Sequence, residues 1–471
     1  MGEEHPPQAV RQLGISNPPA DPVFLYHQAG ITRGVIVTDD TTSGINPLLS
    51  RRNFLRAGVL GAAGAGVAMY AGRQASNAVA APGFVPTKSV DVHLAATDGW
   101  VSMPDASPAD PPYWPDPLAP APYNMYVFGF RNVTGLSDAQ VIAQKGHAQI
   151  SAPVLAFDEG TEVKIGLTNL GLAQRPDLVD GHTLHWHGFN NAIPIFDGVP
   201  EMSAAVPIGK TMIYYYRPTD PGTYMYHCHF EDVEHVQMGM TGLVYIRPKM
   251  NNGANRYVFN DAATRYDREF PVFVTENNPE GHYRDAHIQI TDWAAYNSGF
   301  GLMNGRAWPD TIVTNPQTSD AALGQNFDPL ATYPAGSDGE RLQFQPQTSL
   351  IHVNAGETVL LRVANLGSSV HTLTMDGVSM HVIGSDALQL TGADGTDNSY
   401  ITNSIDVGPG ESRDVLFTAP DPGTYKLYDR DFYNLSNQGA AGYGGIMTNV
   451  VVEAPGTLPA QPLQPFTPGV R

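Results

Sequence analysis

The sequence predicts an all-β protein that contains two copies of one β-sandwich. Glycine and proline are both abundant, with 48 and 39 residues, and only 15% of the residues are charged. This composition favours a β-rich chain with many turns over a helical one. At 471 residues the chain is long enough for two or three domains with large cores.

Short apolar segments support this fold class. Residues 163–167 alternate apolar with small or polar side chains, as a half-buried strand does. Residues 213–216 and 243–246 are rich in β-branched and aromatic side chains, which are typical of strands. We therefore expect a strand in each of these segments.

The two copies are visible as an internal repeat of three segments in the same order, at offsets of roughly 190 to 200 residues. The repeated pairs are Gly160-Thr161-Glu162-Val163 with Gly356-Glu357-Thr358-Val359, His182-Thr183-Leu184 with His371-Thr372-Leu373, and Asp220-Pro221-Gly222-Thr223-Tyr224 with Asp421-Pro422-Gly423-Thr424-Tyr425. Such a repeat predicts two β-sandwiches in tandem. The expected parts are a leader and signal at 1–81, a first domain at 84–247, a linker at 248–266, a second domain at 267–453 and a proline-rich tail at 454–471.

The start of the chain indicates an export signal. Arg51 and Arg52 precede a small-residue apolar run at 57–71, and Ala78-Val79-Ala80 offers a cleavage site. Together these features predict export by the twin-arginine pathway to the periplasm, the cell envelope or the medium. A membrane anchor is the alternative, but the run is shorter than the roughly 20 residues that a spanning helix needs. We expect no membrane span in the mature protein.

Charge and cysteine content narrow the possible partners. The formal net charge is -20 and the sequence pI is about 5.0, which disfavours nucleic acid and anionic membrane surfaces. The single cysteine, Cys228, excludes a disulfide within the chain. In an exported protein, one unpaired cysteine suggests a reactive or metal-ligating thiol.

Two histidine-rich segments contain the candidate metal-binding residues of the chain. The first is His182-Thr183-Leu184-His185-Trp186-His187-Gly188, and the second is His227-Cys228-His229, followed by His235 and by Met238-Gly239-Met240. On a strand, residues two apart face the same way, so each histidine pair shares one face. The cysteine between the second pair faces the opposite way, so one strand can serve two metal sites.

One of these sites has the composition of a blue-copper centre. Cys228, His235 and Met240 lie around one loop, and His182 supplies a second imidazole from the first segment. Two imidazoles, a thiolate and a weak thioether are the ligands of a blue-copper electron-transfer site. Ordinary buried histidines beside an inert thiol are one alternative. Zinc is another, although a zinc site more often has further cysteines or an open three-ligand pocket.

The order of these motifs resembles that of the multicopper oxidases, and of laccase-like enzymes in particular. The motifs are His-x-x-His-x-His-Gly, Asp-Gly-Val-Pro, Gly-Thr-Tyr-x-Tyr-His-Cys-His and His-x-x-Met-Gly-Met, and the resemblance extends over residues 84–453. It implies two cupredoxin domains, which are Greek-key β-sandwiches, with bound copper. By this resemblance type 1 copper is held by His182, Cys228, His235 and Met240, and type 2 and type 3 coppers by His185, His187, His227 and His229.

The resemblance also suggests a role for Asp197 in the Asp-Gly-Val-Pro motif. In the family an acid at this place relays protons near the type 2 copper. The alternative is an ordinary turn aspartate before a glycine.

Two features depart from the family pattern. The loop between the cysteine and the next type 1 histidine is two residues longer than usual, and it carries Glu231, Asp232 and Glu234. The second repeat has lost its histidine pairs, and the residues in the matching places are Thr374, Asp376, Tyr428 and Arg430. A three-copper cluster in this family needs eight histidines, and the first domain supplies four. We therefore expect a homo-oligomer, either with two first domains facing across a two-fold axis or as a head-to-tail ring.

The resemblance implies an oxidoreductase that takes one electron at a time from a phenolic, amine or metal-ion donor and reduces O2 to water. Acidic residues near His235 could attract a cationic donor, or could simply form a solvated loop. A copper nitrite reductase and a non-enzymatic blue-copper electron carrier are the alternatives. The nitrite reductase is disfavoured because the second repeat has no histidine near Arg430.

Overall fold

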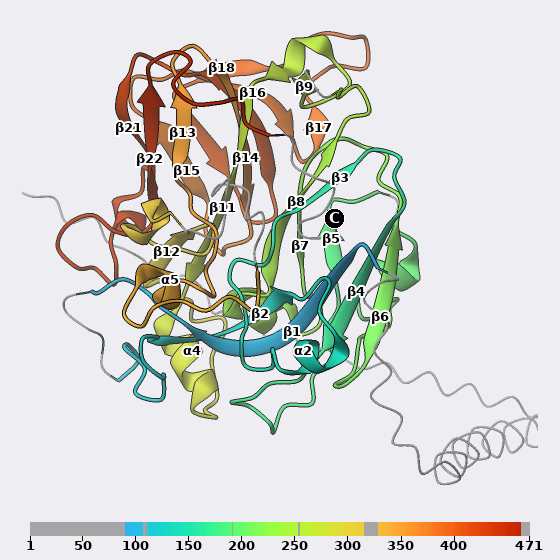
Figure 1. Cartoon of the computed structure of the whole chain (residues 1–471), viewed down its shortest axis with the longest axis vertical. Helices are drawn as coiled ribbons and strands as arrows, with labels where there is room; N and C mark the ends of the chain where they lie inside the picture. Colours follow the sequence, from blue (N-terminus) through green and yellow to red (C-terminus); the bar gives the residue numbers. More distant parts are fainter. Residues whose placement is uncertain are drawn as a thin grey trace, which may run out of the picture. The chain divides into compact units, whose positions relative to one another are not determined.

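The computed structural model describes residues 90–106, 110, 112–190, 192–252, 255–314 and 328–462. The expected leader and signal at 1–81 lie outside the described residues, as does the end of the tail at 463–471. The all-β fold class is confirmed, because the described chain consists mainly of strands arranged in two sandwiches (Figure 1).

The first sandwich has two sheets of four strands each. One sheet has the order β2-β1-β4-β6, with bounds Met125–Asn132, Val92–Val101, Val163–Asn169 and Thr211–Tyr216. The other has the order β3-β8-β7-β5, with bounds Leu155–Asp158, Thr241–Arg247, Gly222–His227 and His185–His187. The three segments expected to be strands lie in β4, β6 and β8.

The second sandwich consists of a seven-stranded and a five-stranded sheet. The larger sheet contains β12 (Phe300–Met303), β11 (Arg268–Asn277), β14 (Thr358–Asn365), β20 (Ser412–Thr418), β16 (Met380–Ser385) and β17 (Leu388–Gln389) in that order, with β18 (Tyr400–Thr402) paired to β16. The smaller contains β13 (Ile351–Asn354), β22 (Met447–Glu453), β21 (Gly423–Asp429), β15 (His371–Met375) and β19 (Ser404–Val407).

Short elements connect the strands. The α-helices are α2 (Asp138–Ile142), α3 (Asp232–Met238), α4 (Pro279–Ala286) and α5 (Asp338–Arg341), and the 3-10 helices are η3 (Pro194–Phe196), η4 (Ala262–Thr264), η5 (Asp310–Ile312) and η7 (Phe432–Leu435). A small two-stranded sheet of β9 (Arg256–Tyr257) and β10 (Arg265–Tyr266) lies in the segment expected to link the domains. Among the described residues, we find no helix with the length and apolarity required to traverse a bilayer.

Equivalent asparagines show the repeat at atomic level. The side-chain amide of Asn169, at the end of β4, donates to the carbonyls of Asp180 and Val206 at 2.8 Å each. Asn365, at the end of β14, donates in the same way to the carbonyls of Ser369 and Val407. Each asparagine therefore closes the loop that leads to the next histidine-containing segment in its own sandwich.

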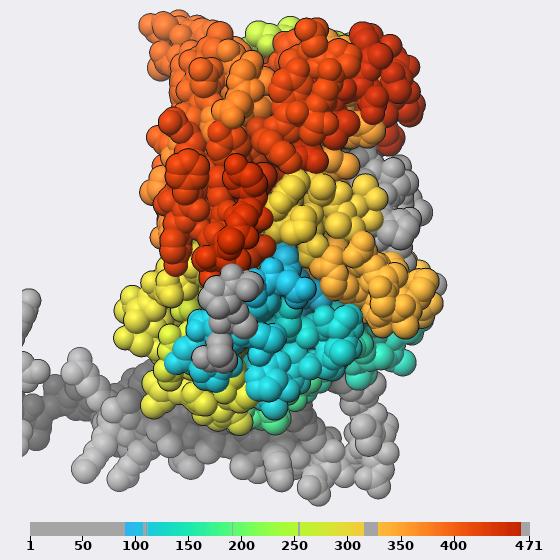
Figure 2. Space-filling view, turned by 90° about the vertical axis from the view of Figure 1, so that its left-hand side faces the viewer, coloured from blue at the N-terminus to red at the C-terminus, as the bar shows by residue number. Residues whose placement is uncertain are grey.

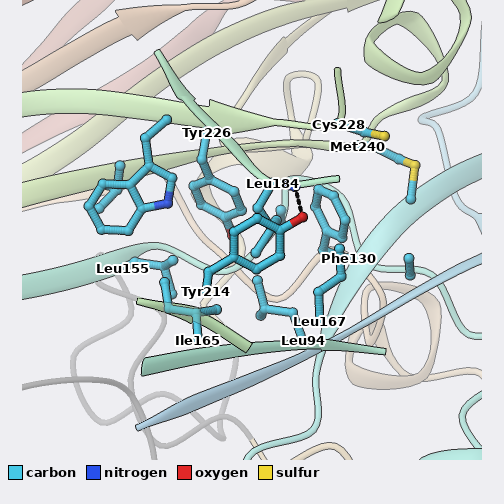
Figure 3. Close-up of a cluster of buried hydrophobic side chains, with 14 of the residues drawn as sticks. Leu94, Phe130, Leu155, Ile165, Leu167, Leu184, Tyr214, Tyr226, Cys228 and Met240 are labelled. Carbon is cyan, nitrogen blue, oxygen red and sulfur yellow. Dashed lines mark hydrogen bonds between the residues drawn. The ribbon is translucent and has the colours of Figure 1, made fainter. Parts of the chain in front are cut away.

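The core of the first sandwich extends directly to the residues predicted to bind metal. Figure 3 shows Leu94, Phe130, Ile165 and Leu167 packed around Tyr214, with Cys228 and Met240 at one edge. The Tyr214 hydroxyl accepts a hydrogen bond from the backbone N–H of Leu184, at 3.1 Å. This bond fixes the chain between the first two histidines of the first segment to the core.

The two sandwiches share a buried apolar interface. Its members are Val154, Ala156, Met225, Leu243 and Tyr245 from the first sandwich, and Phe273, Ala364 and Leu366 from the second. Beside it the fully buried guanidinium of Arg362 pairs with Glu269 at 2.7 Å and Asp414 at 3.4 Å. A third contact involves residues near 300 and 344, which pack on residues 101–125 (yellow and orange beside blue in Figure 2).

Candidate metal centre

Four buried side chains meet at the edge of the first sandwich. The Sγ atom of Cys228 lies 3.3 Å from Nδ1 of His235 and 3.8 Å from Nδ1 of His182. Met240 is fully buried, and Figure 3 shows its sulfur beside that of Cys228. The four residues predicted to bind type 1 copper are therefore brought together.

Local backbone geometry holds three of these residues in place. Cys228 directly follows β7, and the enlarged loop after it forms α3, which carries His235. The helix ends at Gly239, where φ is 116° and a Cβ atom would lie 2.6 Å from Cγ2 of Ile150, so the sharp turn requires glycine. After this turn the Met240 N–H donates to the His235 carbonyl and the Met240 carbonyl accepts from the Cys228 N–H.

The electrostatics of this group suit a bound cation. The backbone N–H of Thr183 donates to the Cys228 sulfur at 3.4 Å. Burial lowers the pKa of His182 well below its usual value, so that ring is a neutral donor. Burial also lowers the pKa of His235, but the negative charges of Cys228 and Asp180 outweigh it and raise the pKa to about 10.

The donor set also selects the metal. A buried thiolate, two imidazole Nδ1 atoms and a thioether sulfur form a soft, compact set that fits copper in a blue site. The negative charge that favours protonation of His235 equally favours a metal cation among these atoms. These residues therefore fit the predicted type 1 copper.

Four further histidines lie on the other side of Cys228. The ring centroids of His185, His187, His227 and His229 are 5.1 to 6.1 Å apart in the neighbouring pairs. Nδ1 of His185 lies 2.6 Å from the Asp197 carbonyl, and Nδ1 of His227 lies 2.8 Å from the Cys228 carbonyl. Because each Nδ1–H donates to a carbonyl, Nε2 of both rings is left as the metal-binding atom.

Three of these histidines, His185, His187 and His227, are neutral near neutral pH. Burial lowers the pKa of His227 to about 3, and it also lowers the pKa values of His185 and His187. A metal-binding imidazole must be unprotonated, so the low pKa values favour metal binding.

The four-histidine group is incomplete within the described chain. Among the described residues, only two groups of three or more His, Cys, Asp or Glu side chains have their ligand atoms within 4.8 Å of one another, namely His182-Cys228-His235 and Asp180-Glu231-His235. The other described histidines contact residues elsewhere; they are His93, His147, His282, His287, His352, His371 and His381. No described histidine is therefore placed to complete this group.

Asp197 lies beside this group, at the end of η3. Its carboxylate is 3.6 Å from Nδ1 of His185, in addition to the carbonyl contact. The following residue, Gly198, has φ of 84°, and a Cβ atom there would lie 2.3 Å from the Leu184 carbonyl oxygen. The Asp-Gly turn is therefore required for the backbone of Asp197 to reach His185, whereas its proton-relay role stays a prediction.

Sequence reasoning missed Asp180. A carboxylate oxygen of this residue lies 3.9 Å from Nε2 of the fully buried His235, and neither atom has a hydrogen-bond partner. Glu231, which the sequence had singled out, completes a small acidic group around the same ring edge. The available signal was the position of Asp180, two residues before His182.

The second sandwich has no matching histidine pairs. At the places of two of the missing ligands, the Tyr428 hydroxyl donates to both carboxylate oxygens of Asp376, at 3.0 Å each. The expected loss of ligands from the second repeat therefore leaves a tyrosine–aspartate contact there.

The fold and the buried cysteine site define a blue-copper protein built on two cupredoxin sandwiches. Two family models described as multicopper oxidase match residues 131–251 and 285–454, which together are more than half of the chain. The chain belongs to the multicopper oxidase family, whose members are copper-dependent oxidoreductases, and copper is its cofactor.

Known relatives are similar over parts of the chain. Multicopper oxidase MCE of Talaromyces pinophilus is 34% identical over 22% of this chain and 16% of its own length. Putative laccase-17 of Oryza sativa subsp. japonica is 26% identical over 61% of this chain and 42% of its own length. The matched region is therefore less than two thirds of the length of either relative.

Solved structures support the fold. The blue copper oxidase from Nitrosomonas europaea superposes with a TM-score of 0.51 at 20% identity, covering 76% of this chain and 85% of that one. At this identity the likeness establishes the cupredoxin-sandwich architecture.

Proposed function

We propose that the protein is a laccase-like oxidase that couples one-electron oxidation of a donor to the reduction of O2 to water. The observation that carries the proposal is that His227 and His229 directly flank the type 1 ligand Cys228. Bound copper supplies the one-electron redox chemistry at both ligand groups. Four donors lose one electron each, and these electrons with four protons convert one O2 into two waters.

The chain connects the two ligand groups by its shortest covalent route. The Cys228 backbone joins the thiolate to the histidines on either side, and the His227 ring donates to the Cys228 carbonyl at 2.8 Å. One strand end therefore holds both groups in fixed relation to each other. On the solvent side, the partly exposed carboxylate of Asp197 lies 3.6 Å from Nδ1 of His185, which supports the proton-relay role proposed for it.

The acidic side chains near His235 indicate the class of donor. The His235 ring has no exposed surface, and Asp180 and Glu231 lie against its Nε2 edge. A donor that approaches this edge therefore meets carboxylates on a protein of net charge -20. This field favours cationic amines or metal ions over anionic phenolates.

Asp180→Asn should weaken the use of cationic donors. Removing one charge next to the donor should raise KM for a cationic aromatic amine about fivefold, equivalent to about 1 kcal/mol. KM for a neutral phenol should stay unchanged. Steady-state oxygen uptake measures both, and Asp421→Asn, an exposed change in the second sandwich, is the matched control. An equal effect of Asp180→Asn on both donors would contradict the assignment.

We also propose that another copy of the chain completes the four-histidine group. No described histidine of the same chain can do so, as shown above. The loop that carries Asp197 exposes apolar side chains, with exposed fractions of 55% for Ile193, 44% for Ile195 and 65% for Met202. An exposed apolar rim around an incomplete metal site favours a subunit contact. The arrangement proposed has two first domains facing across a two-fold axis.

A blue-copper electron carrier is the second candidate, because the four-histidine group is incomplete within the part of the chain that the structure describes. Oxygen uptake with a phenolic or amine donor separates the candidates. The oxidase consumes O2 continuously with excess donor, whereas a carrier accepts only a stoichiometric number of electrons. Turnover with nitrite in place of O2 would indicate the nitrite-reductase alternative.

We further propose export by the twin-arginine pathway, on the basis of the signal at 50–80, outside the described residues. Changing Arg51 and Arg52 to lysine should retain the protein in the cytoplasm, since the receptor recognises the arginine pair. Cell fractionation with immunoblotting measures this. Unchanged export of the lysine variant would show that the signal was misidentified.

A further inference from the structure

The second sandwich has a buried polar group at the position of the type 1 site. In the first sandwich the Cys228 N–H donates to the Met240 carbonyl, and in the second the Asp429 N–H donates to the Ile446 carbonyl. The repeat also aligns His182 with His371. By these equivalences, Asp429 takes the place of the cysteine and Ile446 takes the place of the methionine.

A fourth residue completes the equivalence. The Asn434 side-chain amide lies 2.9 Å from the Asp429 carboxylate, just as His235 lies 3.3 Å from Cys228. Asn434 belongs to η7, which follows β21, as His235 belongs to α3, which follows β7. The second sandwich therefore keeps one histidine and replaces cysteine, histidine and methionine by aspartate, asparagine and isoleucine.

Both ring nitrogens of the histidine in this site are occupied by hydrogen bonds. Nδ1 of His371 lies 2.6 Å from the Asp429 carboxylate, and Nε2 lies 2.7 Å from the Glu276 carboxylate. Glu276 also accepts from the backbone N–H groups of Ser368 and Ser369 and from the Tyr296 hydroxyl. The side chains of Glu276, His371 and Asp429 are all buried.

The chemistry of this arrangement requires a charged ring. A neutral imidazole has one N–H donor, but here each ring nitrogen faces a carboxylate, so two donors are needed. Burial lowers the pKa of His371, but its hydrogen bonds to Asp429 and Glu276 outweigh this and raise the pKa to about 9. The other groups facing the ring are the uncharged Asn434 from η7 and, through Glu276, Tyr296.

We infer that the second sandwich contains a metal-free counterpart of the type 1 copper site, in which the His371 imidazolium between Glu276 and Asp429 takes the place of the metal ion. The positive charge that copper supplies in one repeat is supplied by a proton in the other. The buried carboxylates of the second sandwich consequently need no copper ion to balance their charge. Its backbone retains the geometry of a blue-copper site.

Introducing the type 1 ligands into the second sandwich tests whether its backbone retains the geometry of a blue-copper site. In a Cys228→Ser background, which has no thiolate, the changes Asp429→Cys, Asn434→His and Ile446→Met should restore blue absorption and add about one tightly bound copper per chain to the copper that the control holds. The matched control carries Asn434→His and Ile446→Met without the cysteine and should stay colourless. A folded variant, shown by circular dichroism, that binds copper without blue colour or binds none would overturn the inference.

A second measurement on the unaltered second sandwich covers the case in which the rebuilt variant does not fold. Histidine-selective NMR of the full-length, copper-free Cys228→Ser chain should show the His371 ring doubly protonated at pH 8, with titration near pH 9. His371→Gln assigns the signal, and His381, whose Nε2 lies 2.7 Å from the Ser399 hydroxyl, serves as a second assigned reference. Titration of His371 below pH 7 would refute the imidazolium and with it the inference.

The same charge makes a prediction for stability. Because the folded-state pKa of His371 is raised above its unfolded value of about 6.5, its stabilising effect is complete below pH 6.5 and is lost as pH rises through about 9. Unfolding temperature should therefore fall over this window, and His371→Gln should flatten the dependence. An equally steep fall in the His371→Gln variant would attribute it to other groups.

Discussion

Cys228→Ser should give a colourless protein that has lost oxidase activity. The wild-type protein with copper should absorb strongly in the red, at roughly 600 nm, through thiolate-to-copper charge transfer. Serine supplies no thiolate, so this band should vanish. Since changing even a residue that only supports a metal ligand typically costs 10- to 100-fold, turnover should fall by about 100-fold or more. Visible absorption, copper analysis and oxygen uptake measure the three effects.

Met238→Leu is the matched control for this change. Met238 is as fully buried as Cys228 and packs in the same apolar core, two residues before Met240, but it is not one of the four predicted type 1 ligands. A swap of similar volume there costs less than about 1.5 kcal/mol, so colour and turnover should persist. A colourless wild-type protein with full copper occupancy would eliminate the type 1 assignment, whatever the behaviour of the variants.

His187→Ala should lower both the copper content and the stability of the oligomer. If two first domains face each other, the assembly should hold about five coppers per two chains, with one cluster on the two-fold axis. Removing His187 takes one ligand from each side, so cluster copper should be lost while blue copper remains. Shared copper stabilises the assembly by mass action. The variant dimer should therefore have a larger dissociation constant, so that it dissociates at protein concentrations at which the wild-type dimer stays intact.

Metal analysis on an oligomer of known mass decides the arrangement. His352→Ala is the control, because this half-exposed histidine contacts Glu453 in the second sandwich. It should leave copper content and assembly unchanged. A trimer with two coppers per chain, whose assembly does not respond to His187→Ala, would exclude the facing arrangement and support the head-to-tail ring.

Local patterns made the type 1 ligands predictable. Cys228, His235 and Met240 lie within one short loop, and the side-chain alternation of a strand separates Cys228 from the histidines beside it. The repeat likewise allowed the two sandwiches to be predicted, because each copy keeps its Asp-Pro-Gly-Thr-Tyr segment at the start of a strand.

Other features depended on contacts between distant parts of the chain. Asp180 approaches His235 because the loop after β4 folds over the copper ligands, and α3 forms where the sequence indicated only an enlarged loop. The sequence also offered no reason to regard His371 as charged.

By itself, the sequence determined the candidate copper ligands, because metal chemistry requires particular side chains and these lie in two short segments. Only the tertiary structure decided what the second repeat does in place of binding copper. His371 is 95 residues from Glu276 and 58 residues from Asp429, and the three meet only after β11, β15 and β21 have packed. A charge on a buried histidine depends on which carboxylates surround it, and that environment exists only in the folded chain.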